Sequence, residues 1–331
     1  MRFYSQEMNQ NYIYPKISII TPSYNQGAFI ERTIVSVLDQ KYPNLEYIII
    51  DGGSTDNTVD IIKKYENQID YWVSEKDKGT YDANNKALER VTGDFWCVVN
   101  SDDLLAKNSL VIIAETIRNN PMKKWFAGAV NYIDENDVVT GQFIPQKPNA
   151  VKGITFIDGC WISHPAVFLS TETIRTIGKF EKYHLMDLNY WLRMEMQGYV
   201  PVVVPTTLAE LRLHKDSKSA DRIKLHAEFL KVLNQFIHQN KLNRFAVIRH
   251  MYKFHKRNYL RILFFDQLVK GNKKKAFKKL FKLTVKFPVS IITRWYWGGI
   301  KRLIVGVTSD DLLRKDFFEK ENNSNWNNLN D

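Results

Sequence analysis

The stretch ISIITPSYNQGAFIERTIVSVLDQKYPNLEYIIID, residues 17–51, decides the fold. Two runs that are apolar at nearly every position, residues 17–21 and 46–51, flank a segment with helical spacing, residues 28–40. Strands that are apolar on both sides belong to a sheet covered on both faces, and a helix between two such strands makes them parallel. The stretch therefore predicts the first strand–helix–strand unit of an α/β sheet.

The same alternation continues to about residue 100 and predicts a doubly wound, mostly parallel, Rossmann-like α/β sheet. Ligands of such sheets bind at the carboxyl ends of the strands. One polar loop alone would be explained by helix caps and turns, whereas four together indicate a site. The four strand ends read TPSYN (21–25), DGGSTD (51–56), EKDKG (75–79) and NSDD (100–103).

The fourth strand end carries two adjacent carboxylates, Asp102 and Asp103. Neighbouring carboxylates repel and raise each other's pKa unless a cation lies beside them. Oxygen ligands of this kind suit Mg2+ or Mn2+, whose coordination is commonly completed by substrate phosphates. The chain contains neither GxxxxGK[ST] nor GxGxxG, so a P-loop ATPase and a conventional dinucleotide site are disfavoured. We expect a metal–diphosphate site of another kind.

Four segments carry a resemblance to a known family: ISIITPSYNQGAFIERTIVSVLDQ, YIIIDGGSTDNT, EKDKGTYDANNKAL and GDFWCVVNSDD. In this order and spacing they resemble the family 2 glycosyltransferases of GT-A fold, especially bacterial enzymes that build surface polysaccharides. The resemblance covers roughly residues 16–215. It implies a GT-A domain over residues 16–215. Around this domain we expect an N-terminal extension (1–15), a helical, basic, amphipathic, membrane-associating region (216–320) and a polar tail (321–331).

The resemblance implies a nucleotide-binding set drawn from all four loops. The Asp51 carboxylate would accept a hydrogen bond from a nucleobase ring N–H, while Gly52 stands where the family usually has a second acid. Residues 78–86 would open a helix facing the ribose or phosphate, although the pattern also fits a solvated amphipathic helix. The implied set is Thr21, Pro22, Ser23, Tyr24, Asp51, Gly53, Ser54, Lys78, Gly79, Asp82, Asn85, Lys86 and Ser101.

The same resemblance implies a metal site. Asp102 would be the main carboxylate ligand and Asp103 its helper, because Asn100 stands where the family frequently has an Asp. His214, in LRLHKDSKS, resembles a terminal His-x-x-x-Ser element that completes the metal or diphosphate site in some relatives; the alternative is a simple loop histidine. Imidazole is compatible with Mn2+.

The segment KYHLMDLNYWLRMEMQGY, residues 182–199, resembles the family's Asp-x-x-x-Trp-x-x-Arg element. In that element the aspartate, here Asp187, is the general base that takes the proton of the acceptor hydroxyl. The alternative for Asp187 is a helix N-cap. Arg193 is expected to be structural. We expect the apolar residues of this helix to be buried, namely Leu188, Trp191, Leu192 and Met194.

Upstream, DGCWISHPAVFLS (158–170) supplies Trp161 and His164, which the resemblance places on the acceptor side. An indole ring can stack on the apolar face of a sugar. For His164 a structural role is equally compatible with the sequence.

The charge is divided unevenly along the chain. Residues 211–331 hold 27 of the 47 basic residues and 10 of the 36 acidic ones, and Asp266 is the only acid between residues 241 and 302. KKKAFKKLFKLTVKF (273–287) predicts an amphipathic helix with Phe277, Leu280, Phe281 and Thr284 on one face. Trp295, Tyr296 and Trp297 follow, as at membrane interfaces.

Three interpretations of residues 241–302 stay open: binding to an anionic membrane surface, packing on the catalytic domain or a partner subunit, and nucleic acid binding. The first is favoured, since a lipid-linked acceptor would be found there, and no nucleic acid partner is expected. The start MRFYSQEMNQ has no apolar h-region, and the two cysteines lie in apolar runs. We expect a cytoplasmic protein, peripheral at the inner face of the cytoplasmic membrane.

Together these features predict a metal-dependent inverting glycosyltransferase that moves a sugar from a nucleotide-sugar, best a UDP-sugar, to a hydroxyl of a lipid-linked or other saccharide. One alternative is a sugar-nucleotide pyrophosphorylase, which would carry a glycine-rich basic loop where TPSYNQG stands. The other is a non-catalytic membrane scaffold with a degenerate transferase domain, suggested by Gly52 and Asn100.

Overall fold

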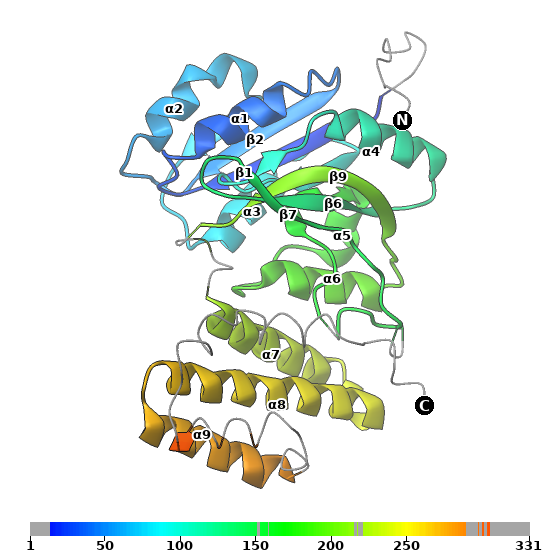
Figure 1. The fold of residues 1–331 in the computed structure, drawn as a ribbon. Coiled ribbons are helices and arrows are strands. Elements are labelled where there is room, and N and C mark those ends of the chain that lie inside the picture. The colour runs from blue at the N-terminus through cyan, green and yellow to red at the C-terminus, as the bar shows by residue number, and fades with distance from the viewer. Residues whose placement is uncertain are drawn as a thin grey trace. The chain divides into compact units, whose positions relative to one another are not determined.

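A computed structural model describes residues 14–150, 153–157, 159–214, 217, 221–288, 297, 300 and 303–304. The chain divides into two compact units, Met1–Ile248 and Arg249–Asp331. The described part of the first unit is built around a nine-stranded sheet with helices on both faces (Figure 1). The second unit contains most of α8 (Ala246–Val269) and all of α9 (Lys273–Lys286).

The sheet is mixed, with its first four strands parallel. Strand β8 runs antiparallel to β4 and β6, and β5 and β7 run antiparallel to their partners. The predicted doubly wound, mostly parallel sheet is confirmed. In order the strands are β3 (Tyr71–Ser74), β2 (Leu45–Asp51), β1 (Ile17–Ser23), β4 (Phe95–Val98), β8 (Val167–Ser170), β6 (Trp125–Ile133), β9 (Val202–Arg212) and β5 (Leu104–Leu105), with β7 (Val139–Phe143) paired to β6.

Helices cover both faces because the central strands are apolar on both sides. Every residue of β1 is buried, and its side chains alternate between the two faces. Helix α1 buries Ile30, Ile34 and Val37, the spacing of one helical stripe. One face carries α1 (Ile30–Leu38), α2 (Thr58–Lys64) and α4 (Ser109–Asn119), and the other α3 (Thr80–Leu88), α5 (Glu172–Ile177) and α6 (Met186–Met196) (Figure 1).

Aromatic contacts hold α6 against the second face. Trp96 of β4 meets the Tyr190 ring edge-on at 6.0 Å between centroids, and Trp125 of β6 stacks on Trp191 at 5.5 Å. Such pairs add to the free energy gained by burying the rings. The predicted burial of Leu188, Trp191, Leu192 and Met194 is confirmed. This packing fixes the first turn of α6, which contains Asp187.

The strand ends are in register at one edge of the sheet. Ser23 lies beside Asp51, and Asp51 lies beside Ser74. The prediction that Thr21, Pro22 and Ser23 form a loop after the first strand is wrong: they are the last three residues of β1. Pairing with β2 continues to the end, and the Ser23 carbonyl accepts a hydrogen bond from Gly52 N–H at 2.8 Å.

Helix α7 (Arg222–Gln239) belongs to the first compact unit, although it lies beyond residue 215. Asp221 caps it by accepting from Lys224 N–H at 2.9 Å. The functional division of the chain at residues 215–216 stays a prediction.

The second unit is held by apolar residues of two helices. Leu260, Phe264 and Leu268 of α8 pack with Ala276, Leu280 and Leu283 of α9. Among the described residues no helix has the length and apolarity required to cross a bilayer.

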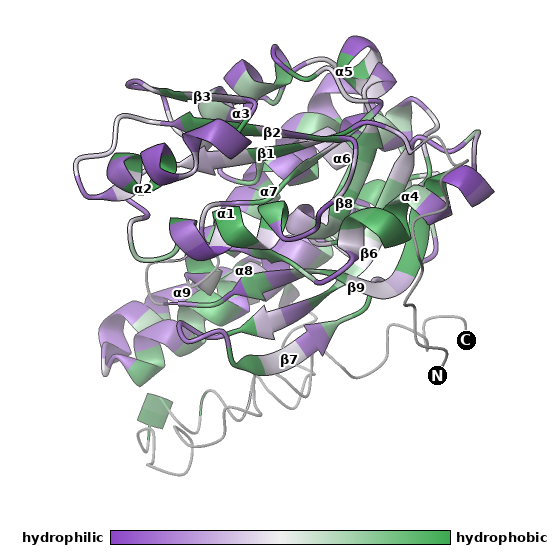
Figure 2. Cartoon of the chain, turned by 90° about the horizontal axis from the view of Figure 1, so that it is seen from above, coloured by the Kyte–Doolittle hydropathy of each residue, from purple (hydrophilic) through white to green (hydrophobic). Residues whose placement is uncertain are grey.

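The helix predicted over residues 273–287 is confirmed as α9, and its apolar residues divide between two sides. Leu280 faces α8, whereas Phe277, Phe281 and Val285 are 60%, 61% and 65% exposed. Lysines flank this exposed side, and Figure 2 shows the mixed colouring of the helix. Trp295 and Tyr296 lie outside the described residues, and Trp297 is exposed.

Candidate active site

Asp51, at the end of β2, is fully buried and organises the second loop. Its carboxylate accepts hydrogen bonds from the main-chain N–H groups of Gly53 and Ser54, at 3.1 and 2.9 Å, and from the hydroxyls of Ser54 and Ser74. Gly53 adopts φ +81°, which favours glycine. The carboxylate predicted to meet the nucleobase thus already binds its own loop, and the nucleobase contact stays a prediction.

The first and second loops are bound to each other. Asn25 N–H donates to Ser54 Oγ at 2.7 Å, and Thr55 N–H donates to Asn25 Oδ1 at 2.8 Å. Thr21 Oγ1 lies 3.2 Å from the Tyr47 hydroxyl inside the sheet. Tyr24, by contrast, is 58% exposed. Of the predicted base-binding residues in this strand and loop, Tyr24 is the one whose side chain is open to a ligand.

In the third loop and α3, most of the predicted ligand groups are already bound to other groups of the protein. Lys86 Nζ forms an ion pair with Glu75 at 2.6 Å, which raises the pKa of Lys86. Asp82 accepts from Lys78 N–H at 3.1 Å. The Asn85 amide donates to the Phe180 carbonyl and accepts from Phe180 N–H, at 2.9 and 2.8 Å. Asn85 therefore joins α3 to the segment that precedes α6.

The acidic loop after β4 meets the end of β9. Asp102 Oδ2 lies 3.1 Å from His214 Nε2, so the structure brings two of the three predicted metal ligands together. Asp103 turns inward, where its carboxylate accepts from the Asn100 amide at 2.9 Å and from Arg212 N–H at 3.0 Å. Burial and the neighbouring Asp102 raise the pKa of Asp103. Asp103 thus holds the loop rather than facing His214.

The donor set of Asp102 and His214 fits a divalent cation of the manganese type. It offers one carboxylate and one imidazole, whose side chains are 21% and 5% exposed. Within the described residues no group of three or more His, Cys, Asp or Glu side chains is placed to hold a metal. Since Mg2+ and Mn2+ commonly bind through one or two protein groups, substrate phosphates and water, two protein donors suffice. Ser101 is buried, and its carbonyl accepts from Thr33 Oγ1.

Asp187 lies in the first turn of α6 and is half-buried. In the described part of the chain its carboxylate has no hydrogen-bond or ion-pair partner. The adjacent Met186 Sδ is 3.9 Å from the Asn84 amide of α3, so the predicted base lies beside the predicted nucleotide helix. Arg193 is structural, as predicted: it donates to the carbonyls of Ile177 and Lys179, both at 2.7 Å.

The acceptor-side candidates lie in the segment that leads to β8, and His164 contacts α6. Trp161 is buried, stacks on Phe156, and donates from Nε1 to Thr155 Oγ1 at 2.7 Å. His164 lies beside the Trp191 ring, at 5.8 Å between centroids. The carboxylate of Glu195 accepts from the main-chain N–H groups of Thr155 and Phe156.

The sequence did not predict the roles of Glu195 and Arg212. Glu195 binds the segment that leads to Trp161, and Arg212 binds the acidic loop. Glu195 is one acid among many on helices, and no motif marks it. Arg212 had one signal, an arginine two residues before the predicted ligand His214.

Comparisons with known proteins show the family and the fold of the chain. The model of the family "Glycosyl transferase family 2" matches residues 18–141. The chain belongs to glycosyltransferase family 2, and its fold is the GT-A fold.

Among its relatives is TuaG of Bacillus subtilis, named for teichuronic acid biosynthesis, which is 32% identical over 63% of this chain and 84% of TuaG. WfgD of Escherichia coli, a UDP-Glc:alpha-D-GlcNAc-diphosphoundecaprenol beta-1,3-glucosyltransferase, is 30% identical over 69% of this chain and 88% of WfgD. The mannosyltransferase PcManGT from Pyrobaculum calidifontis, solved with GDP-Man and Mn2+, has a TM-score of 0.54 at 17% identity and covers 92% of this chain and 88% of its own.

Proposed function

We propose that the protein is an inverting glycosyltransferase that moves a sugar from a UDP-sugar to a hydroxyl of a lipid-linked saccharide in bacterial polysaccharide biosynthesis. The observation that carries the proposal is the Asp102–His214 pair at the carboxyl edge of the sheet. Helix α6 adds the Asp187 carboxylate, which has no hydrogen-bond or ion-pair partner among the residues that the structure describes. The relative WfgD is named for a UDP-Glc donor and a diphosphoundecaprenol-linked acceptor, which supports both substrate classes.

In the proposed reaction the acceptor oxygen attacks the anomeric carbon while the bond from that carbon to the UDP oxygen breaks on the opposite face. Asp187 takes the proton of the acceptor hydroxyl, and the sugar's configuration inverts. Asp102 and His214 would hold a divalent cation, which when bound offsets the charge that develops on the leaving diphosphate. The buried loop 100–103 keeps Asp102 in place for this role.

The proposal places the enzyme at the inner face of the cytoplasmic membrane, where a lipid-linked acceptor is found. Helix α9 supports this location, because it has seven lysines and no acid and exposes Phe277, Phe281 and Val285 on one side. Asp266, the one acid of residues 241–302, is already paired with Lys270 at 2.7 Å. Each basic residue near an anionic surface contributes about 1 kcal/mol, and the exposed rings can enter the headgroup region.

A nucleotide-release assay with a panel of donors and lipid-linked oligosaccharide acceptors tests the proposal. Asp187→Asn is expected to lower kcat by about 100- to 10,000-fold while leaving UDP affinity near the wild-type value. Asp102→Asn is expected to weaken UDP binding in the presence of Mn2+. Normal turnover of Asp187→Asn would remove Asp187 as the base. A wild-type protein that binds neither UDP nor Mn2+ would instead favour the non-catalytic scaffold.

A further inference from the structure

The guanidinium of Arg212, the last residue of β9, is fully buried where three segments meet. Its Nε donates to the main-chain carbonyl of Asp102 at 2.8 Å. Its Nη1 donates to the Asp134 carbonyl at 2.7 Å and lies 2.5 Å from Asp137 Oδ1. Together with the bond from its own N–H to Asp103, one arginine therefore holds both acidic residues of the loop and the turn between β6 and β7.

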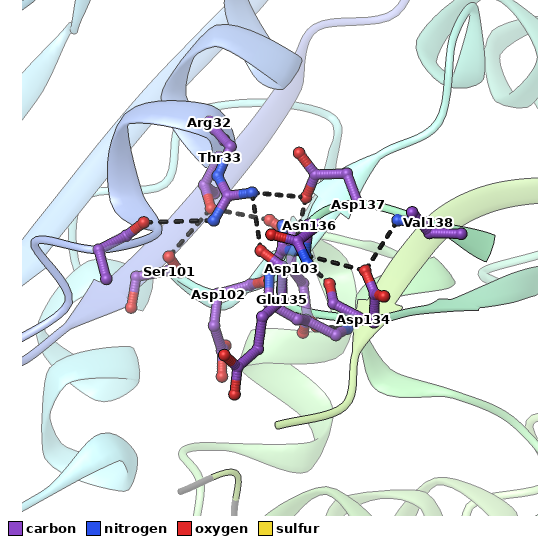
Figure 3. A network of polar contacts seen from close by, with 12 residues as sticks. Arg32, Thr33, Ser101, Asp102, Asp103, Asp134, Glu135, Asn136, Asp137 and Val138 are labelled. Atoms are coloured by element: carbon purple, nitrogen blue, oxygen red, sulfur yellow. Dashed lines mark hydrogen bonds and ion pairs between the residues drawn. The ribbon is translucent and has the colours of Figure 1, made fainter. Parts of the chain in front are cut away.

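A second arginine, from α1, also binds the β6–β7 turn (Figure 3). Arg32 of α1 lies 3.0 Å from Asp137 Oδ1 and donates to the Glu135 carbonyl at 3.1 Å. The same carboxylate oxygen thus lies within ion-pair distance of two arginines. Arg32 makes no hydrogen bond with Asp102 in the described part of the chain. Of the two arginines, Arg212 is therefore the one that bonds directly to both the turn and the acidic loop.

His214 lies close to the same residue in the chain and shares a packing partner with it. Arg212 and His214 are two residues apart at the end of β9, and both pack on the ring of Phe29. The guanidinium carbon lies 5.1 Å from the ring centroid, and the imidazole centroid lies 4.9 Å from it. Arg212 thus bonds to the main chain of Asp102 and packs on the same ring as His214, the two members of the 3.1 Å contact.

We propose that Arg212, with Asp137 as its counter-ion, is a positioning residue that sets the geometry of the Asp102–His214 pair toward a divalent cation. The inference rests on the proposed function, because that function assigns the pair to the metal. Residues that orient metal ligands typically change metal affinity by about 10- to 100-fold when they are replaced. A lysine at position 212 keeps the charge but lacks the fork that reaches three acceptors at once.

The test measures Mn2+ affinity by electron paramagnetic resonance in the presence of UDP, and amide hydrogen exchange of the metal-free protein. Arg212→Lys is expected to raise the Kd for Mn2+ by about 10- to 100-fold and to speed exchange over residues 100–105. Asp137→Asn, at a partly exposed position, is expected to raise the Kd for Mn2+ and to speed the exchange as well. If Arg212→Lys fails to fold, the Asp137→Asn variant tests the proposal in its place. Arg32→Gln is the matched control, since it removes a partner of Asp137 without touching the acidic loop, and it should keep wild-type Mn2+ affinity.

Folded Arg212→Lys and Asp137→Asn proteins with wild-type Mn2+ affinity and wild-type exchange would overturn the proposal. An equal loss of affinity in Arg32→Gln would also overturn it, because the effect would then belong to the turn as a whole. A wild-type protein that does not bind Mn2+ would refute the metal part of the proposed function. In that case, amide hydrogen exchange over residues 100–105 is the measurement that tests whether Arg212 positions the acidic loop.

Discussion

His214 Nε2 and Asp102 Oδ2 lie 3.1 Å apart although 112 residues separate them in the chain. The contact joins the loop after β4 to the residue that follows the end of β9 by two positions. Because Asp103 is turned inward, Asp102 is the carboxylate of the acidic loop that faces His214. In the proposed function this pair holds the cation that meets the diphosphate.

Replacement of His214 by Gln removes the imidazole while keeping a polar side chain. We expect Mn2+ affinity in the presence of UDP to fall about tenfold or more, the change that corresponds to roughly 1.4 kcal/mol. Titration calorimetry measures it. His238→Gln, at an exposed position of α7, is the control and should match the wild type. Unchanged Mn2+ affinity in His214→Gln would make His214 a loop histidine.

The sequence could predict which residues gather at the site because parallel strands bring their carboxyl ends to one edge. Asp51 and Asp102 are predicted in this way, and Asp187 is predicted from the family resemblance; their roles in the site stay predictions. The orientation of Asp103 could not be predicted, since it depends on a hydrogen bond from Arg212 N–H, 109 residues away.

Glu195 of α6 fixes the segment that leads to Trp161. In the Glu195→Gln variant one carboxylate oxygen becomes an amide donor facing the N–H groups of Thr155 and Phe156. We expect a loss of about 1–3 kcal/mol in the free energy of unfolding and a higher KM for the acceptor, with donor KM unchanged. Chemical denaturation and initial-rate kinetics measure these. Glu172→Gln, at an exposed acid, is the control, and an unchanged acceptor KM in Glu195→Gln would separate this segment from the acceptor.

The two apolar sides of α9 illustrate a limit of periodicity. Residues 276, 280 and 283 and residues 277, 281 and 285 all follow helical spacing. Which set is buried depends on the partner, and here α8 covers the first set. The sequence predicted the helix itself, but not that Leu280 is buried while Phe277 and Phe281 are both exposed.

The exposed side of α9 leads to a prediction on membrane attachment. Phe281→Ser is expected to reduce binding to vesicles that contain phosphatidylglycerol by about tenfold, since burial of a Phe side chain contributes roughly 1.5–3 kcal/mol. Sedimentation with vesicles measures it, and added salt should weaken the wild type further. Met122→Ser, at an 85% exposed apolar residue of the first unit, is the matched control. Equal binding by Phe281→Ser and wild type would favour the alternative that this side packs on protein.

Glu46 lies near the start of β2, at the end of the sheet opposite the candidate site. It leads to a prediction on how the stability of the protein changes at acid pH. Burial would raise the pKa of this carboxyl, but hydrogen bonds from Ser18, Thr92 and Lys16 outweigh it and lower the pKa from 4.5 to about 2. A carboxyl whose pKa is lower in the folded state adds stability above its unfolded pKa and loses it as the pH falls through the folded pKa. The contribution should therefore be complete above pH 4.5 and vanish toward pH 2.

The Glu46→Gln variant isolates this contribution, because it removes the titration and keeps the shape of the side chain. We expect the wild type to exceed the variant by about 2–3 kcal/mol in the free energy of unfolding at neutral pH, and the difference to shrink as the pH falls from 4.5 toward 2. Urea denaturation at several pH values measures it. Glu172→Gln, at an exposed carboxylate paired with Lys124, should show only a small difference from the wild type across that range. A gap between wild type and Glu46→Gln that stays constant with pH would mean that Glu46 stabilises the sheet through shape and neutral hydrogen bonds rather than through its charge.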